Sequence, residues 1–471
     1  MDRIELICPK CKTTYEFNPY AKLCPKCRAP LFTKYSLLDR DTFIRCIEEA
    51  HLRHEYGIWS FGSLLPVDSG ESLGEGWTPV IEVKNLGSEY NIRLLLKNES
   101  LNPTGTFIDR GVAVDVSYAY RNGFRNIVSV SLGDYAVSLS TYATRYSIKV
   151  THYIPRNIEL WKLYRISIHG SRINLVDSYV DELRRALERY RDRSIYLSIS
   201  SSPTVIDGYR TIVFELYRYI ARGVRWIALP IGEGVLATAI YKGLYELSEY
   251  MDIDDVRILG VKLYTDKPGS IPGATPDLIY ELGVGETPTQ RFIENIANKD
   301  VLHIVNVDGD TIIRSALGLA RREGVYIDPI GATSLAGVVE AVERGVIDRN
   351  ESVIAIVSGS PSKDPYTLYS LIEKDEKAFE RIRNMDIDRY SINKIQREIL
   401  RILYEKNILY LYAIWRELLN RGYNISLQTL HYHINKLISY TLIEPIKITD
   451  NERTYYRLTN LGLETLEKIR E

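Results

Sequence analysis

Short apolar runs alternate with longer stretches of helical periodicity between residues 34 and 380. Several of the runs are bounded by Gly or Pro, and each is apolar along most of its length. Such runs are typical of parallel strands whose two faces are covered by helices. Examples of the runs are Ile92–Leu96, Ile127–Val130, Ile195–Ile199, Trp226–Pro230, Val256–Leu263 and Val353–Val357. The pattern predicts an α/β domain over residues 34–380, built on a parallel sheet.

A different pattern follows the charged stretch Glu373–Asp388. Apolar residues at helical spacing predict three helices, and Ser426 is a good N-cap for the third. The residues of the third helix expected to face the core are Leu427, Leu430, Ile434 and Leu437. Two predicted strands follow, Ile443–Thr449 and Arg453–Leu458. Three helices and a two-stranded wing predict a winged helix-turn-helix domain over residues 385–471.

The third helix carries polar side chains on the faces turned away from its apolar stripe. Side chains of this kind contact phosphates and base edges in a DNA major groove. The DNA-binding candidates are Gln428, Thr429, His431, Tyr432, Asn435 and Lys436 on this helix and Arg453 on the wing. The segment Tyr455–Leu466 resembles the wing and final helix of winged-helix regulators, and this resemblance also implies a DNA partner.

The charge of the chain qualifies this expectation. The formal net charge is −1 at pH 7, so a nucleic-acid surface must be local. From Met385 to Glu471 there are 13 Lys and Arg residues against 11 Asp and Glu residues, a small excess for a DNA-binding domain. The alternative is a winged helix that serves dimerisation or protein contact.

The N-terminal segment, residues 1–33, holds four of the five cysteines of the chain in two Cys-Pro-Lys-Cys turns. Each turn aims two thiolates at one point, and two such turns complete a tetrahedral site that suits zinc. The predicted zinc ligands are Cys8, Cys11, Cys24 and Cys27. A site with four protein ligands has no open position for catalysis, so we expect a structural zinc ribbon. The alternative is two exposed thiol pairs.

The middle domain resembles threonine synthase and its relatives among the fold-type II pyridoxal-phosphate enzymes, whose fold is like that of the tryptophan synthase β subunit. The resemblance covers about residues 65–370 and follows the chain in order. It rests on the segments Gly74–Pro79, Lys97–Gly111, Ser131–Asp134, Pro230–Val235, Asp328–Gly337 and Ser358–Pro365. Zinc ribbons also occur on such enzymes. The resemblance implies a cofactor cleft at the ends of the parallel strands.

The residues that would hold the cofactor depart from the family pattern. The resemblance places the Schiff-base lysine at Ile108, which has no amine. It places at Asp134 an asparagine that bonds the 3′-oxygen of the cofactor, so a carboxylate would face an oxyanion. In the phosphate loop, Glu233 adds a negative charge and Val235 replaces a glycine.

Other positions still match, including the hydroxyl residue that meets the pyridine nitrogen. We therefore expect a vestigial cofactor pocket, no bound pyridoxal phosphate and no catalytic residue. The positions of this pocket are Ile108, Asp134, Gly232, Glu233, Gly234 and Ser358.

No apolar run reaches the roughly 18 residues of a membrane span, and the N-terminus lacks a signal pattern, so we expect a cytoplasmic protein without a membrane partner. Together these features predict a homodimeric DNA-binding transcription regulator. Its inactive core would sense a small-molecule effector or mediate dimerisation. One alternative is an active pyridoxal-phosphate threonine synthase or related lyase with a regulatory DNA-binding tail, which requires a lysine near the pocket. The second is a non-enzymatic protein-interaction scaffold without affinity for DNA.

Overall fold

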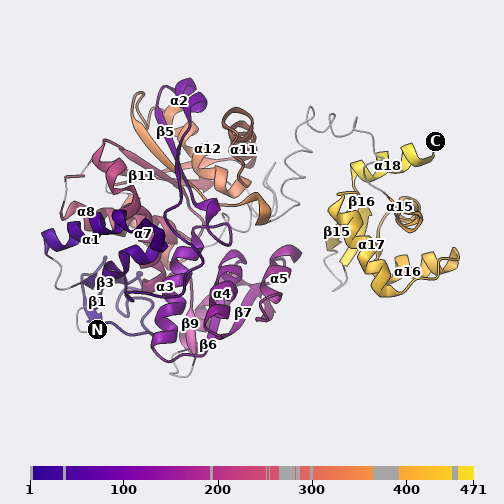
Figure 1. The fold of residues 1–471 in the computed structure, drawn as a ribbon, viewed down its shortest axis with the longest axis horizontal. Coiled ribbons are helices and arrows are strands. Elements are labelled where there is room, and N and C mark those ends of the chain that lie inside the picture. The colour runs from indigo at the N-terminus through magenta and orange to yellow at the C-terminus, as the bar shows by residue number, and fades with distance from the viewer. Residues whose placement is uncertain are drawn as a thin grey trace. The chain divides into compact units, whose positions relative to one another are not determined.

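The chain divides into two compact units, Met1–Asp364 and Pro365–Glu471 (Figure 1). The computed structural model describes residues 4–35, 39–190, 195–250, 252–253, 255–264, 282, 287–297, 301–363, 392–447 and 454–470. The boundary predicted between residues 380 and 385 lies outside the described residues, so the division into three domains stays a prediction. Within the described part of the chain, no helix is both long and apolar enough to cross a membrane.

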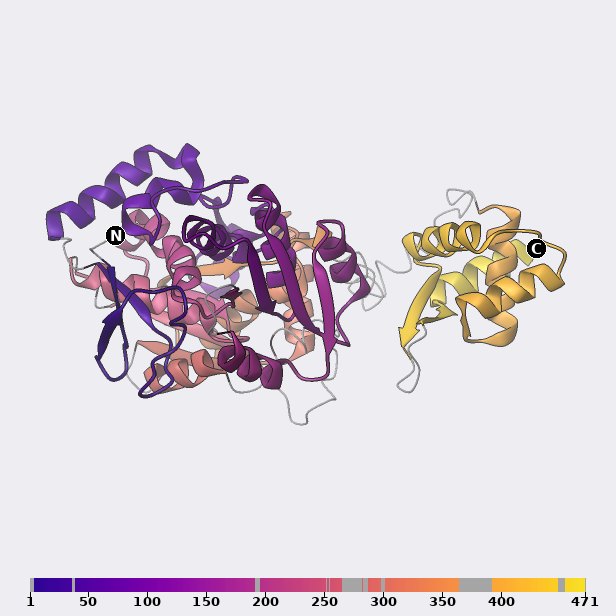
Figure 2. The ribbon, with the colours of Figure 1, turned by 90° about the horizontal axis from the view of Figure 1, so that it is seen from below.

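The N-terminal segment forms a three-stranded antiparallel sheet in the order β2-β1-β3, drawn in indigo in Figure 2. The strands are β1 (Ile4–Ile7), β2 (Thr14–Glu16) and β3 (Phe32–Tyr35). Each cysteine pair is followed by a residue whose amide donates back to the carbonyl of the first cysteine, at 2.9 Å in both turns. These residues, Lys12 and Arg28, have φ angles of 59° and 60°. The two repeats of the motif therefore fold as equivalent knuckles.

The larger sheet of the first unit has six strands in the order β12-β11-β10-β13-β5-β4. All neighbours are parallel except β4, which lies antiparallel to β5 at one edge. The strands are β4 (Val80–Glu82), β5 (Arg93–Asn98), β10 (Trp226–Pro230), β11 (Arg257–Leu263), β12 (Leu302–Val307) and β13 (Ser352–Val357). Trp226 and Ala228 belong to the core on one face, and Ile227 and Leu229 to the core on the other.

A second, parallel sheet has the order β8-β7-β6-β9. Its strands are β6 (Asn126–Val130), β7 (Lys149–Pro155), β8 (Arg172–Val176) and β9 (Tyr196–Ser198). The six apolar runs of the sequence all form strands of these two sheets, which confirms the α/β class. The edge strand β8 was not predicted, because none of its residues is fully buried and it lacks an apolar run.

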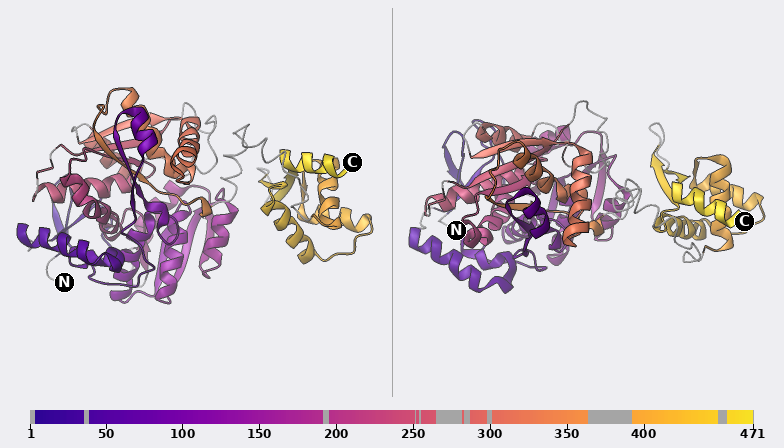
Figure 3. Two further views of the ribbon diagram at one scale, coloured as in Figure 1. Left: turned by 45° about the horizontal axis from the view of Figure 1, so that its top comes forward. Right: turned by 90° about the horizontal axis from the view of Figure 1, so that it is seen from above.

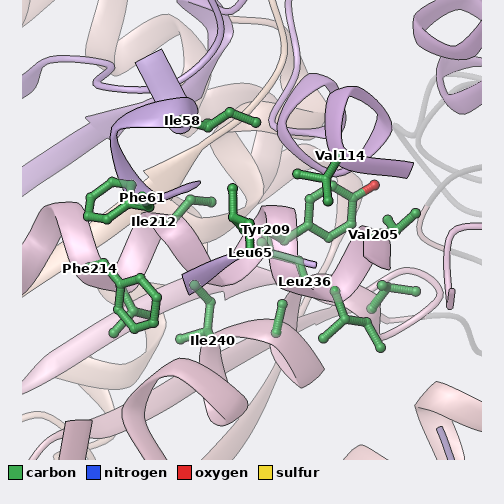
Figure 4. Packing of buried hydrophobic residues seen from close by; sticks show 14 of the residues in the cluster. Ile58, Phe61, Leu65, Val114, Val205, Tyr209, Ile212, Phe214, Leu236 and Ile240 are labelled. Carbon is green, nitrogen blue, oxygen red and sulfur yellow. The ribbon is translucent and has the colours of Figure 1, made fainter. Parts of the chain in front are cut away.

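Helices separate and cover the two sheets, and α7 packs between α3 and α8 at the centre of the unit. The helices are α1 (Arg40–Leu52), α2 (Lys84–Tyr90), α3 (Ile108–Arg121), α4 (Asp134–Arg145), α5 (Leu160–Ser167), α6 (Tyr179–Arg189), α7 (Pro203–Ala221), α8 (Val235–Ser248), α10 (Pro288–Ala297), α11 (Gly309–Glu323) and α12 (Pro329–Glu343), with 3-10 segments η1 (His54–Leu64), η2 (Glu99–Leu101) and η3 (Pro361–Lys363). Figure 4 shows Val114, Tyr209 and Leu236 from the three central helices in one apolar cluster.

In its described residues, the second unit has four helices about a short antiparallel sheet in the order β14-β16-β15 (Figure 3). Its elements are α15 (Lys394–Lys406), β14 (Leu409–Tyr410), α16 (Leu411–Asn420), α17 (Leu427–Ser439), β15 (Ile443–Lys447), β16 (Thr454–Leu458) and α18 (Asn460–Arg470). The predicted helices and strands are present, but the third strand, β14, was not predicted. The tip between β15 and β16, with Arg453, lies outside the described residues.

One core residue predicted for α17 is corrected by the structure. Leu430, Ile434 and Leu437 are buried, whereas Leu427 is 38% exposed. Helical spacing indicates the side of the helix on which a residue lies. It does not indicate how far along the helix the neighbouring elements extend, and Leu427 is the first residue of α17.

Candidate functional site

A cavity of about 120 Å³ lies at the carboxyl ends of β6 and β10, where α3, α4, α8 and α12 begin. Its lining is mostly apolar. The described residues that line it are Phe107, Ile108, Val130, Ser131, Leu132, Gly133, Asp134, Tyr135, Ser200, Tyr209, Pro230, Gly232, Glu233, Gly234, Val235, Leu236, Leu282 and Ile330. Clefts for cofactors and small ligands are usually about 300–1,000 Å³, so this cavity is small for that purpose.

Ile108 is the first residue of α3, and it forms part of the cavity wall. No lysine is among the residues that line the cavity in the described part of the chain. Lys97, the nearest lysine in the motif, is buried away from the cavity. Its Nζ donates to the Glu215 carboxylate and to the Thr78 carbonyl, both at 2.5 Å. These residues therefore offer no free amine to which an aldehyde could attach, so they do not fit a lysine-bound pyridoxal phosphate.

Asp134, at the start of α4, lies beside two buried lysines. Lys363 Nζ is 2.5 Å from its Oδ2, and Lys162 Nζ is 3.6 Å from its Oδ1. Burial opposes the ionisation of Asp134, but the two amines outweigh that effect and hold the pKa of this carboxyl below its ordinary value. Lys363 also lies 3.2 Å from Asp328, whose pKa is raised by burial. Asp134 is therefore an ionised member of an internal charge cluster.

The sequence did not predict this cluster. Asp328 and Lys363 lie within two of the segments that carry the family resemblance, so their positions were available as a signal. However, no spacing rule brings residues 134, 328 and 363 together, because they meet only through the order of the strands. The charge cluster is defined here as Asp134, Lys162, Asp328 and Lys363.

The glycine loop Gly232–Gly234 precedes α8, and Gly234 has a left-handed φ of 82°. Thr287 Oγ1 donates to the Glu233 carbonyl at 2.7 Å, which fixes the loop. The Tyr179 hydroxyl donates to the Glu233 carboxyl. Burial raises the pKa of Glu233, against the opposing effect of its hydrogen bonds from Tyr179 and Ser200.

Ser358 is placed differently from the sequence prediction. Of the six positions predicted for the vestigial pocket, it alone is not among the residues that line the cavity. Its Oγ accepts a hydrogen bond of 3.3 Å from the Phe107 amide, at the start of α3. The hydroxyl therefore holds the backbone next to Ile108.

Behind the cavity lies a buried ionic network that joins β5, η2, α3 and α7. The Arg110 guanidinium donates to Glu99 Oε2 at 2.7 Å and to Glu215 Oε1 at 2.5 Å. Glu215 also accepts from Lys97, and all four side chains are at most 2% exposed. The ionic network is defined here as Lys97, Glu99, Arg110 and Glu215.

The four predicted zinc ligands come together at the two knuckles. Their sulfur atoms all lie within 4.8 Å of one another. The Sγ atoms of Cys8 and Cys27 are 3.4 Å apart, and those of Cys11 and Cys24 are 3.6 Å apart. Such a group of four thiols fits a tetrahedral metal ion. Cys46, on α1, is not part of this cysteine cluster.

In the second unit, the structure places the predicted DNA-contacting residues of α17 at its surface. Five of them, Gln428, Thr429, His431, Tyr432 and Asn435, are exposed, and Lys436 is half-buried. Ser426 caps the helix by accepting from the Thr429 amide at 3.0 Å.

Comparison with known proteins places the first unit among pyridoxal-phosphate enzymes. Residues 71–359 match the family described as "Pyridoxal-phosphate dependent enzyme". Threonine synthase of Methanocaldococcus jannaschii is 29% identical over 382 residues, which are 76% of this chain and 92% of that protein. Threonine synthase of Mycobacterium tuberculosis is 31% identical over 303 residues, 63% of this chain and 84% of that protein.

Solved structures show the same fold at lower identity. Threonine deaminase isoform 2 from Solanum lycopersicum aligns with a TM-score of 0.53 and 17% identity, over 71% of this chain and 89% of that one. Maize serine racemase aligns with a TM-score of 0.52 and 19% identity, over 72% of this chain and 98% of that one.

Proposed function

The chain belongs to the pyridoxal-phosphate dependent enzyme family, and from this premise we propose that it is a non-catalytic member that binds DNA and regulates transcription. The main support for the proposed loss of catalysis is the position of Ile108, at the start of α3 and in the wall of the cavity. An aliphatic side chain can neither bind an aldehyde covalently nor transfer a proton. The small volume of the cavity, about 120 Å³, supports the same conclusion.

The competing function is that of an active pyridoxal-phosphate enzyme, and Lys363 is the observation that favours it. This lysine is buried beside Asp134, which lines the cavity. Against this function, the Lys363 amine already pairs with two buried carboxylates, those of Asp134 and Asp328, and Lys363 is not among the described residues that line the cavity.

Borohydride trapping separates the two functions. The full chain is incubated with pyridoxal phosphate, reduced, digested and analysed by mass spectrometry. We expect no pyridoxyl adduct on any lysine of the first unit. An adduct on Lys363 that is lost in Lys363→Met and kept in the matched control Lys162→Met would establish the competing function.

The proposed DNA-binding surface is the exposed side of α17. The order of elements in the second unit, with the helices α15, α16 and α17 followed by the hairpin β15–β16, supports its interpretation as a winged helix. Contacts to phosphates release counterions, so affinity for a duplex of random sequence should fall steeply between about 50 and 200 mM salt. A chain ending at Asp364 should not bind. Equal binding by both chains would assign the contact to the first unit, and no binding by either would favour the protein-interaction scaffold.

The cysteine cluster is proposed to hold one structural zinc per chain. Metal analysis of the purified protein should give about one zinc, and Cys24→Ser should lower this content because it removes a ligand. Cys46→Ser is the matched control, since Cys46 is outside the cluster. Full zinc content in Cys24→Ser would contradict the assignment.

The core is proposed to form a homodimer and to bind a small effector in the cavity. An apolar cavity of about 150 Å³ can hold a molecule the size of benzene. The cavity of about 120 Å³ therefore limits the effector to a molecule of about that size. Small aliphatic compounds can be screened by thermal shift, and any hit titrated into the DNA-binding assay. Coupling between the two sites of about 1–3 kcal/mol is typical of effectors. A monomer by sedimentation, with no hit that alters DNA affinity, would contradict both roles.

A further inference from the structure

Five exposed residues of α17 form a stripe along one face of the helix. They are Gln428, His431, Tyr432, Asn435 and Ser439, and each lies three or four residues from another member of the stripe, whereas the exposed residues Leu427 and Thr429 lie to its two sides. Residues at these spacings share one face of a helix. The buried residues Leu430, Ile434 and Leu437 lie on the other side. The reading stripe is defined here as Gln428, His431, Tyr432, Asn435 and Ser439, and it is the face of α17 opposite these buried residues.

The chemistry of the stripe is neutral and amide-rich. Leu427–Ser439 contains no Arg, Asp or Glu, and its single charged residue, Lys436, lies beside the stripe. Three arginines of the second unit are paired with carboxylates instead: Arg401 with Glu398, Arg421 with Glu398 and Glu405, and Arg457 with Glu444. The side chain that reads guanine best is thus absent from α17.

Different base pairs are recognised by different side chains of a helix in the major groove. Asn and Gln make paired hydrogen bonds to N6 and N7 of adenine, whereas Arg and Lys do so to O6 and N7 of guanine. The methyl group of thymine is contacted by apolar surfaces such as an aromatic ring or a threonine methyl. The stripe provides Gln428 and Asn435 for adenine and the Tyr432 ring, 60% exposed, for thymine. All three side chains therefore favour recognition of an A·T base pair.

Resting on the proposed DNA binding, we propose that α17 selects A·T base pairs in the major groove, read by Gln428, Asn435 and Tyr432. Gln428 and Asn435 are seven residues apart, or about 10 Å along a helix. With base pairs about 3.4 Å apart, the two amides reach positions about three base pairs from each other. The target half-site therefore contains two adenines at about this spacing, with thymine on the opposite strand.

The test is selection of bound duplexes from random DNA by the full-length protein, followed by sequencing. The selected half-sites should be enriched in A·T at two positions about three base pairs apart. Asn435→Ala should relax the preference at one position by roughly fivefold to a hundredfold, while affinity for random DNA changes little. Asn435→Arg should shift that position towards guanine. Asn420→Ala, an exposed amide at the end of α16, is the matched control and should leave the selected site unchanged.

Asn435 is exposed, so circular dichroism of each variant should match that of the wild type. Selected sites dominated by G·C, or a preference that Asn435→Ala and Asn435→Arg both leave intact, would overturn the A·T assignment while DNA binding stands. If no duplex is retained even at low salt, the proposed function itself fails, and the assignment fails with it.

Discussion

Two regions of the first unit share the segment Lys97–Gly111, yet they have different chemistry: the ionic network includes Arg110, and the cavity is lined by Ile108. The ionic network buries Arg110 between two glutamates. At the start of α3, the apolar side chain of Ile108 lines the cavity. The network joins β5, η2, α3 and α7, whereas the aliphatic side chain of Ile108 can form no hydrogen bond or ion pair. The difference indicates that the contacts that stabilise the fold, such as those of Arg110, are separate from the residues that would hold a cofactor. The fold can therefore form with an isoleucine at position 108.

The largest expected effect comes from breaking the ionic network. Arg110→Ala would leave the Glu99 and Glu215 carboxylates buried without their main partner. Removal of one member of a buried ion pair costs about 3–5 kcal/mol, so we expect a loss of this size in the free energy of unfolding. Urea denaturation measures it. Arg121→Ala, at the exposed end of the same helix, should cost less than about 1 kcal/mol. Similar losses of stability in Arg110→Ala and Arg121→Ala would show that the buried ionic network contributes no more than an exposed ion pair.

A smaller loss in the free energy of unfolding is expected from the charge cluster, of which Asp134 lines the cavity. Asp134→Ala would leave Lys363 with Asp328 as its remaining carboxylate partner, at a cost of about 1–3 kcal/mol at pH 7. The pKa of Asp134 is lower in the folded protein than in the unfolded chain. Its contribution is therefore present above the unfolded pKa of about 3.9 and is lost as pH falls through the folded pKa. Wild type and variant should converge in acid, and a constant difference across pH would show that the ion pair is not the cause.

Replacement of the buried Lys22 should have the opposite effect on the free energy of unfolding to replacement of Arg110. Lys22 is 5% exposed, and its Nζ lies 4.0 Å from the centre of the Tyr196 ring. Burial lowers the pKa of Lys22 to about 8, against the opposing effect of Asp115. The folded protein favours the neutral amine, so its stability rises with pH between about 8 and 10.5.

Lys22→Met should therefore raise the free energy of unfolding at pH 7 by about 1–2 kcal/mol. This gain should shrink as pH rises from about 8 towards 10.5, because the wild-type amine is then neutral in the folded protein and no longer has to be buried as a cation. Denaturation at pH 7 and pH 10 measures both effects. A destabilised variant at pH 7 would show that the amine makes a net favourable contact.

The smallest effect is expected at Ile108. Ile108→Val removes one methylene group from a half-buried wall, so the loss in stability should be below about 1 kcal/mol. Thermal unfolding measures it. A loss as large as that of Arg110→Ala would mean that Ile108 has taken on a structural role, and the contrast between the two regions would fail.

Much of the fold could be predicted because its signals are local. Apolar runs such as Trp226–Pro230 became buried strands, since a strand covered on both faces must be apolar throughout. The cysteine turns predicted the cluster, because each pair is close in sequence and the two turns are alike. The edge strand β8 was not predicted, since it is not fully buried at any position and lacks an apolar run.

The sequence by itself determined that residue 108 is an isoleucine, which has no amine in any fold. It also determined the face of α17 that is polar, since helical spacing alone separates Gln428 and Asn435 from Leu430 and Ile434. Only the tertiary structure decided that Lys363 lies against Asp134 and that Ser358 bonds the backbone before Ile108 instead of lining the cavity. These partners are separated by more than two hundred residues and meet through the parallel order of the strands. No local pattern in the chain encodes such contacts.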